Sequence, residues 1–378
     1  MNTRIFSWLE TRWVAPSFSG WLLSGLACFF FLAATNTMAG WLYVISGVIF
    51  SLLAIAARLA KQTLHQIQLS RRPILPVSAG DALTIEVLVQ NGTPKRKELL
   101  QVEDLMPSVL GQPGRRVVET LMPHGTHYWV YEQPAAKRGL YRWYTVRVKT
   151  AAPLGLFWCR KEFEVGAIAT VYPTVLPLSR CPLIDELGRE PSLQANLHQR
   201  SHTATTGLTR SLRPYRWGDA TRMIHWRTSA RYGELRVREL ETFSSGQEIL
   251  LCLDSANSWD LDAFEQAVIA AASLYRYATR QALNVRVWTA GSGVIEGEQT
   301  VLETLAAIAP GEAAQTDYLP TSPVVWLTQN PLSLNTLPAG SRWLLWNAPP
   351  KEPITPPGLV MQPERALHHQ LHDRPTSL

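Results

Sequence analysis

Two apolar runs near the N-terminus constrain this chain more than any other feature. They extend from Trp21 to Ala34 and from Ala39 to Leu59, and the second has the roughly 20 apolar residues that a membrane-spanning helix needs. The first run is shorter, but residues 17–20 can extend it. A secretory signal peptide is the alternative interpretation of the first run, but no clear small-residue cleavage site follows it. We therefore predict a short N-terminal tail and two transmembrane helices in the lipid bilayer over residues 1–62.

The charges around the two runs predict how the chain crosses the membrane. Arg4 and Arg12 precede the first run, four basic residues follow the second between positions 58 and 72, and the loop TNTMAG is uncharged. Since basic residues concentrate on the cytoplasmic side, we expect both termini in the cytoplasm, at a bacterial inner (plasma) membrane. The four cysteines show neither CxxC pairing nor a zinc-binding spacing, so reduced or buried thiols are expected.

The pattern of residues 63–178 predicts a β-sandwich. The segment LTIEVLVQNG alternates apolar and polar residues and ends in the turn signal Asn-Gly. Further strand-like segments follow at short spacing, with Pro and Gly between them. No pair of carboxylates and no histidine cluster marks a site there. The domain is therefore interpreted as a spacer or a binding surface.

Residues 247–348 have a different pattern. QEILLCLD is a continuous apolar strand, residues 261–280 have helical periodicity, and NVRVWTA, PVVWLTQ and RWLLWNA are further strands. Strands that alternate with helices predict an α/β domain with a parallel, doubly wound sheet covered on both faces. Residues 349–378 are rich in Pro and His and lack an apolar period, which predicts a disordered tail.

An arginine-rich segment, residues 179–246, lies between the two domains. From Arg200 to Arg238 the chain has nine arginines, no lysine and two acids, a local charge of +7 in a chain whose net charge is +6. The remainder of the chain is therefore almost neutral, and one segment carries the excess positive charge.

The motif RPYRWGDATRMIHWRTSARYGELRVRE in this segment resembles the signature of the family called domain of unknown function fifty-eight. The resemblance extends to the two N-terminal spans, the β-rich section and RGLYRWYTVRVKTAAPLGLF at 138–157. It implies a membrane-anchored protein whose C-terminal part is similar to a von Willebrand factor A domain, with no catalytic activity. Such proteins are usually encoded beside a MoxR-type AAA+ ATPase and often beside a membrane transglutaminase-like protein, which the resemblance implies as partners.

The likeness to A domains raises the question of a metal ion. Such domains often hold Mg²⁺ through Asp-x-Ser-x-Ser after the first strand. This chain has DSANS, in which Asp254 and Ser258 are candidate ligands but Ala256 replaces the middle serine, and Gln329 replaces a later Asp. We therefore expect no cofactor, with Mg²⁺ as the alternative. Asp254 is interpreted instead as a turn residue that caps the following helix.

The arginine motif has a structural interpretation. Asp219 is predicted to cap a short helix that starts at Ala220 and ends at Gly233. In the strand ELRVREL that follows, Leu235 and Val237 are expected to point inward. Residues predicted to hold the motif in its fold are called the frame, and they are Arg213, Tyr215, Gly218, Asp219 and Trp226.

The frame does not use every arginine, because the segment has too few acids, and the surplus fits three functions. A nucleic-acid site would use arginines on phosphates and Tyr215, Trp217 and Trp226 to stack bases. An enzyme would need Asp219, His225 and Ser229, whose spacing matches no known arrangement. A docking face for an acidic protein fits best, since arginine and tryptophan contribute most to interface energy. The residues predicted to bind the partner are Arg222, Arg227, Arg231, Arg236 and Arg238.

The sequence thus predicts a membrane-anchored, non-enzymatic adaptor or assembly protein that docks a protein partner and no nucleic acid. The resemblance implies a MoxR-type ATPase as this partner. The alternatives are a divalent-metal-binding A domain that grips another ligand and a nucleic-acid-binding membrane protein.

Overall fold

The computed structural model describes residues 14–187, 209–215, 221, 224–240, 248–314, 322–346 and 356–375. The chain forms two compact units, Met1–Pro173 and Thr174–Leu378. The boundary lies at residue 173 rather than 178, because Leu178 and the short helix α4 (Pro182–Leu187) pack into the core of the second unit.

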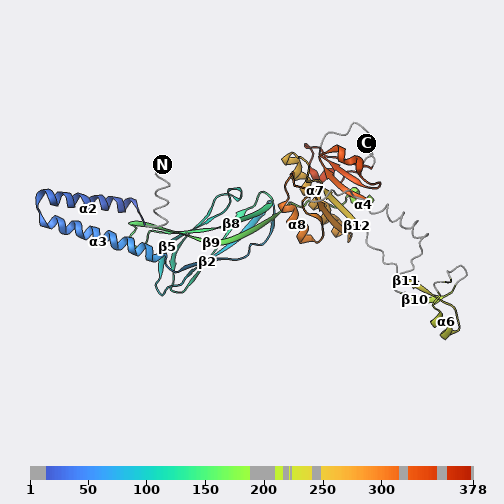
Figure 1. The fold of residues 1–378 in the computed structure, drawn as a ribbon, viewed down its shortest axis with the longest axis horizontal. Helices are drawn as coiled ribbons and strands as arrows, with labels where there is room; N and C mark the ends of the chain where they lie inside the picture. The colour runs from blue at the N-terminus through green and yellow to red at the C-terminus, as the bar shows by residue number, and fades with distance from the viewer. Residues whose placement is uncertain are drawn as a thin grey trace. The chain divides into compact units, whose positions relative to one another are not determined.

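The first unit begins with a short strand and two apolar helices, which lie side by side in Figure 1. Strand β1 (Ala15–Pro16) leads into α2 (Phe18–Thr37) and α3 (Gly40–Thr63). Ser17 caps α2 through its side chain, which explains why the helix starts before the apolar run itself. Both helices are long and apolar enough to cross a membrane, as predicted.

The rest of the first unit is a sandwich of two sheets, which confirms the predicted architecture. One sheet has the order β1-β9-β8-β5-β6, with β3 beside β9, and the other has the order β2-β4-β7. The elements are β2 (Ile67–Arg71), β3 (Val77–Ser78), β4 (Ala82–Asn91), β5 (Lys97–Leu105), η1 (Ser108–Leu110), β6 (Gly114–Leu121), β7 (Thr126–Pro134), β8 (Gly139–Thr150) and β9 (Phe157–Tyr172). Alternate residues of the strands fill one core between the sheets, as in the buried pattern of β4.

The helical hairpin is attached to the sandwich without a linker. Ala60 and Leu64, at the end of α3, are buried in the sandwich core. At the other helix, the Ser17 amide donates to the Leu156 carbonyl at 2.8 Å. The sandwich therefore starts where the apolar helices end.

The second unit contains a six-stranded sheet of order β14-β13-β12-β15-β16-β17. Neighbours pair in parallel except β14, which pairs antiparallel with β13. The elements are β12 (Glu248–Leu253), α7 (Leu261–Arg280), β13 (Asn284–Thr289), β14 (Gly293–Ile295), α8 (Glu298–Ala307), β15 (Val324–Thr328), η3 (Pro331–Thr336), β16 (Arg342–Leu345), β17 (Gly358–Val360) and α9 (Leu367–Gln370). The predicted parallel α/β domain is therefore present.

The faces of this sheet differ from the doubly wound expectation. Alternate residues of β12 belong to two core clusters, one on each face. Within the described residues, helices α4, α7, α8 and α9 all contribute to the first cluster, whereas the second contains Leu334 of η3 and several tryptophans. The connection from β15 to β16 holds only the short η3, so large aromatic side chains fill that face instead of an α-helix.

The C-terminal residues correct a second prediction. Residues 358–360 form β17, which extends the parallel sheet, and α9 follows. Met361 and Leu371 are buried in the core, so residues 356–375 are ordered structure and not a disordered tail. The segment has too few apolar residues for a period, but a strand at a sheet edge needs only its backbone to pair.

Candidate functional site

The carboxyl ends of β12 and β15 meet at the place where an α/β sheet commonly binds ligands. These two strands are parallel neighbours, and the chain leaves β12 through α7 toward β13 before it returns to β15 on the other side. Ligands of open α/β sheets bind in the crevice outside such a reversal of strand order. Figure 1 shows α7 and β12 within this domain.

A buried carboxylate marks this point. Asp254 follows β12 directly and is 5% exposed. Its Oδ2 accepts hydrogen bonds from the Thr328 hydroxyl at 2.7 Å and the Asn257 amide at 2.6 Å. Its backbone carbonyl accepts from the Trp259 indole at 2.6 Å. Asp254 thus joins the end of β15 to the loop after β12.

The helix cap that the sequence assigned to Asp254 belongs to Asp260. The side chain of Asp260 accepts from the Ala263 amide at 3.2 Å, one residue before α7 begins. The Asp260 amide in turn donates to Gln329 Oε1 at 2.8 Å. The interpretation of Asp254 as a helix cap was wrong, because six further residues precede the first turn of α7.

A second polar pair supports the same loop. The buried Ser255 hydroxyl donates to Glu312 Oε2 at 3.0 Å and accepts from the Ala290 amide at 3.0 Å. Burial raises the pKa of the nearby Cys252 thiol, and Asp254 raises it further, so this cysteine stays protonated. Thr328 and Glu312 were missed by the sequence interpretation, since only the fold brings them beside the DSANS loop, and Asn257 of that loop was not recognised as a partner of Asp254.

The groups around Asp254 do not fit a Mg²⁺ site. Mg²⁺ requires near-octahedral oxygen coordination, mostly by carboxylates and water. Asp254 contributes the one carboxylate in the Asp254–Thr328–Asn257 cluster, and its Oδ2 already receives two hydrogen bonds. Ser258 is exposed and lines a cavity of about 390 Å³ with residues 257, 259, 260, 329 and 330. Within the described part of the chain, no group of three His, Cys, Asp or Glu side chains is placed to hold a metal.

The arginine motif forms a small hairpin with a helix between its strands. Strand β10 (Thr209–Pro214) pairs antiparallel with β11 (Arg236–Leu240), and α6 (Trp226–Tyr232) lies between them in the chain. Ile224 and Val237 are both 5% exposed and form the apolar centre. Gly233 caps the helix in the left-handed conformation, with φ of 71°, as predicted.

The start of the helix differs from the prediction. Helix α6 begins at Trp226, and its cap is His225, whose Nδ1 accepts from the Thr228 amide at 3.2 Å. The Ser229 hydroxyl donates to the His225 carbonyl and accepts from the Arg236 amide at 2.9 Å. His225 and Ser229 therefore have structural roles here. Gly218, Asp219 and Arg222 lie outside the described residues.

The exposed side of the hairpin carries arginines and aromatic rings. Arg227 and Arg231 are exposed, one turn apart on α6, and neither forms an ion pair with any other described residue. Trp226 and Tyr232 are 65% and 60% exposed. This set, Arg227, Arg231, Trp226 and Tyr232, is the α6 surface.

Three assignments within the motif change. Trp226 is exposed and does not contribute to the frame core, and Leu235, 44% exposed, does not point inward. Arg236 was assigned to the docking face, but its guanidinium lies over the Tyr232 ring with its carbon 4.6 Å from the centroid. Arg236 thus supports the hairpin, since a guanidinium over an aromatic face is held by the ring quadrupole.

Two residues of the motif are placed only in part, and Tyr215 is placed in full. For Arg213 and Arg238 the structure describes the backbone, within β10 and β11. Tyr215 is half-buried, and its amide donates to the Leu235 carbonyl at 2.8 Å, which agrees with its assignment to the frame.

The sandwich contains a charged cluster that the sequence did not predict. Arg71 Nη2 donates to both carboxylate oxygens of Asp104 at 2.7 Å, and the two side chains are 1% and 0% exposed. The Tyr131 hydroxyl and the Trp143 indole also donate to Asp104, at 2.7 and 2.9 Å. Burial raises the Tyr131 pKa, and the Asp104 charge raises it further. No spacing in the sequence reveals this cluster, because its members come from four strands.

Comparison with known proteins places the arginine motif in a family. Residues 211–319 match the family model described as "Protein of unknown function DUF58", so the family predicted from the motif is confirmed. A curated relative, "Uncharacterized protein YeaD" of Bacillus subtilis (strain 168), is 28% identical over 225 residues, which cover 58% of this chain. The chain spans about half of that relative, 54% of its length.

Two solved structures resemble parts of the chain. The CARDB domain of the PF1109 protein from Pyrococcus furiosus has 13% identity and a TM-score of 0.19, covering 26% of this chain and 92% of that domain. A β-glucosidase from Listeria innocua has 18% identity and a TM-score of 0.16, covering 26% of this chain and 16% of the enzyme.

Proposed function

We propose that this protein is a membrane-anchored, non-enzymatic adaptor that docks an acidic protein partner through the α6 surface. The single observation that carries this proposal is the exposure of Arg227 and Arg231 beside Trp226 and Tyr232. Arginine and aromatic residues supply most of the binding energy of protein interfaces. Two guanidinium groups without an acid among the described residues are available to carboxylates of another chain.

The partner that fits this proposal is a MoxR-type AAA+ ATPase, which the family resemblance implies, with a membrane transglutaminase-like protein as a further partner. An adaptor role agrees with the hydrogen bonds of His225 and Ser229, which hold the hairpin together. The Ser229 hydroxyl donates to the His225 carbonyl and not to the imidazole ring that would act as its base. We also propose that the protein lies in a bacterial inner membrane with both termini cytoplasmic, on the basis of the flanking positive charges.

Charge reversal tests the docking role. In Arg227→Glu/Arg231→Glu, the reversed charges repel an acidic surface, so capture of the ATPase by crosslinking in native membranes should fall by at least tenfold. The matched control Lys137→Glu/Arg142→Glu makes the same charge change on exposed sandwich residues and should leave capture unchanged. Unchanged capture by the α6 variant, with the control also unchanged, would exclude the α6 surface as the docking face.

A reporter fusion tests the orientation separately. Alkaline phosphatase folds only outside the cytoplasm, so a fusion after Leu378 should be inactive if both termini lie inside. An active fusion would place the α6 surface on the opposite side from a cytosolic ATPase and would overturn this partner.

The second candidate function is that of a von Willebrand factor A-like domain that binds a ligand at the carboxyl ends of β12 and β15, where the strand order reverses. The parallel sheet and the buried Asp254 at the carboxyl end of β12 favour it. Ala256 and Gln329 replace two metal ligands, which disfavours metal-dependent ligand binding. Calorimetry with the full chain should therefore detect no binding of Mg²⁺ at micromolar concentrations. Micromolar affinity that disappears in Asp254→Ala would favour this candidate over a metal-independent adaptor.

A further inference from the structure

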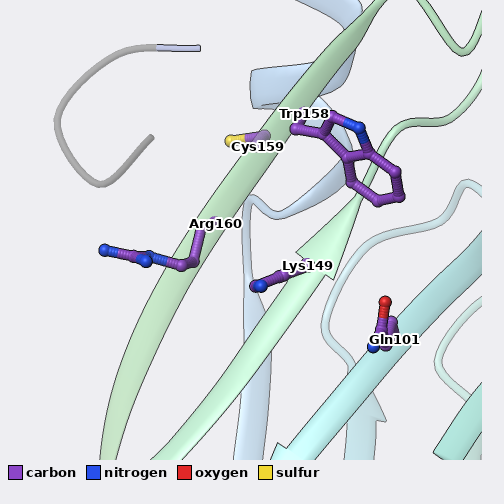
Figure 2. Close-up of a pocket in the computed structure, with 5 residues that line it drawn as sticks. All are labelled: Gln101, Lys149, Trp158, Cys159 and Arg160. Carbon is purple, nitrogen blue, oxygen red and sulfur yellow. The ribbon is translucent and has the colours of Figure 1, made fainter. Parts of the chain in front are cut away.

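A small basic pocket lies at the end of the sandwich that meets the apolar helices. Gln101, Lys149 and Arg160 stand in a row on β5, β8 and β9, since Gln101 is opposite Lys149 and Lys149 is opposite Arg160. Residues that are directly opposite in a sheet point to the same face. With Trp158 and Cys159 they line a cavity of about 210 Å³ (Figure 2).

The strand register places this pocket beside the start of the first apolar helix. Trp158 pairs with Ala15 in β1, and α2 begins at Phe18. The Ser17 hydroxyl, which caps α2, also donates to the Gly155 carbonyl at 2.7 Å, in the turn that precedes β9. Trp158 is therefore held within a few residues of the point where the chain enters the membrane.

The second apolar helix ends at the same place. Ala60 is buried in the sandwich core, and Lys61 beside it is exposed in the last turn of α3. Burial raises the pKa of the Cys159 thiol, while the charge of Lys61 opposes this rise, as expected for two groups that lie close together. The basic row therefore lies close to both the start of α2 and the end of α3.

Exposed apolar side chains occur at the same end of the sandwich as the pocket. Phe18 is 85% exposed, Leu154 47% and Trp158 40%. Aromatic and apolar groups at the end of a membrane span favour the boundary between headgroups and acyl chains. This end of the sandwich is thus suited to contact lipid directly.

The charges on this face of the sheet are sorted along the strands. Glu103 and Glu162, two residues further from the membrane end, bind Arg147 at 3.3 and 3.0 Å. Arg160 Nε lies 3.9 Å from Glu162. Lys149 forms no ion pair with any residue of the described ranges. Lys149 is therefore the cation of the row that has no acid among the described residues, whereas Arg160 shares its charge with Glu162.

We propose that this pocket binds the phosphate headgroup of an anionic phospholipid from the leaflet where α2 and α3 enter the membrane. Lys149 and Arg160 donate charge-assisted hydrogen bonds to the phosphate, and Gln101 donates from its amide. Trp158 packs at the boundary of headgroup and acyl chain. The proposal depends on membrane insertion of the two helices and not on the docking role of α6.

Lipid titration of the full chain tests this site. Purified protein in a neutral detergent is titrated with phosphatidylglycerol, and bound lipid is counted by native mass spectrometry. Phosphatidylglycerol should bind more tightly than phosphatidylcholine. Each basic residue near a membrane contributes about 1 kcal/mol to binding. The affinity for phosphatidylglycerol should therefore fall about 30-fold in Lys149→Gln/Arg160→Gln and about fivefold in Lys149→Gln alone.

The control variant Lys137→Gln/Arg142→Gln removes the same charge near the start of β8, away from Lys149, and should leave lipid binding unchanged. Thermal melting establishes that each variant is folded. The single variant Lys149→Gln stays informative if the double variant unfolds, because Lys149 is only half-buried. Equal binding of both lipids, or equal loss in the control, would overturn the site. Inorganic phosphate that binds as tightly as phosphatidylglycerol would also overturn it, since the pocket would then accept soluble anions.

Discussion

Arginine has opposite roles in the sandwich and in the α6 hairpin. Arg71 is almost completely buried, and both terminal nitrogens are occupied, one by Asp104 and one by the Val165 carbonyl at 3.0 Å. Arg227 and Arg231 are exposed on a seven-residue helix. The side chain is the same, but the buried arginine connects strands of the two sheets, whereas the exposed pair has no acid among the described residues.

Local composition therefore does not determine whether an arginine is buried in an ion pair or exposed at the surface. The buried arginine comes from a segment with ordinary charge, and its acid is 33 residues away on another strand. The exposed arginines come from the most basic segment of the chain, where acids are scarce. A guanidinium is buried only where an acceptor of fixed geometry is available, because an unpaired buried charge is very unfavourable.

The largest expected effect is the loss of the buried acid. Asp104→Ala leaves Arg71 buried without its carboxylate and removes the acceptor of Tyr131 and Trp143. We expect the free energy of unfolding to fall by about 3–5 kcal/mol, measured by chemical denaturation of the full chain in detergent. Glu86→Ala removes the acid of the exposed pair with Arg72 and should cost less than about 1 kcal/mol. Equal losses in both variants would remove the distinction between buried and exposed arginines.

A buried acid without an arginine should have an intermediate effect. Asp254→Ala leaves the Thr328 hydroxyl and the Asn257 amide without their acceptor. Unsatisfied buried polar groups cost about 1–3 kcal/mol, so thermal melting should show a moderate loss. Asp254→Asn keeps an acceptor oxygen and should lose less. A variant Asp254→Ala that is as stable as the original chain would show that the carboxylate is retained for a ligand and not for the fold.

Lys97 is a buried cation whose charge the fold disfavours. Burial and then the charge of Lys161 lower its pKa from 10.5 to about 8. Between these values the unfolded chain binds more protons than the folded chain, so the free energy of unfolding should rise with pH from 8 to about 10. The slope is at most about 1.4 kcal/mol per pH unit. Lys97→Met should remove this contribution, and identical pH profiles for both chains would contradict the lowered pKa.

The smallest effect on stability is expected at the α6 surface. Substitutions of exposed residues usually change the free energy of unfolding by less than about 0.5 kcal/mol. The melting temperature of Arg227→Glu/Arg231→Glu should therefore be almost that of the original chain. Circular dichroism melting of the full chain measures this. A melting temperature as low as that of Asp104→Ala would show that these arginines belong to the frame of the hairpin.

The sequence predicted elements well where one periodicity dominates a long segment. The apolar runs gave the two spanning helices, the alternation in LTIEVLVQNG gave β4, and the apolar run QEILLCLD gave β12. Gly233 was predicted as a helix end because its conformation favours glycine. These features depend on neighbours in the chain, so the sequence alone contains the necessary information.

The candidate sites were predicted less completely. Asp254 was identified at the end of a parallel strand, but its partner Thr328 lies 74 residues away and was not identified. The start of α6 was placed six residues too early, because His225 was not recognised as a cap. The C-terminal strand was missed, since a sheet edge supplies the pairing that the segment itself does not suggest.

The sequence by itself determined the two long apolar helices, the order of a β-rich and an α/β domain, and the concentration of positive charge in one motif. Tertiary structure alone decided which arginine is buried, which carboxylate accepts which donor, and which basic residues stand together at the end of the sandwich that meets the apolar helices. The physical reason is that helix and strand patterns repeat over a few residues, whereas an ion pair or a pocket requires residues from distant strands to meet. Such meetings depend on strand order and register, which are fixed by the packing of the whole core.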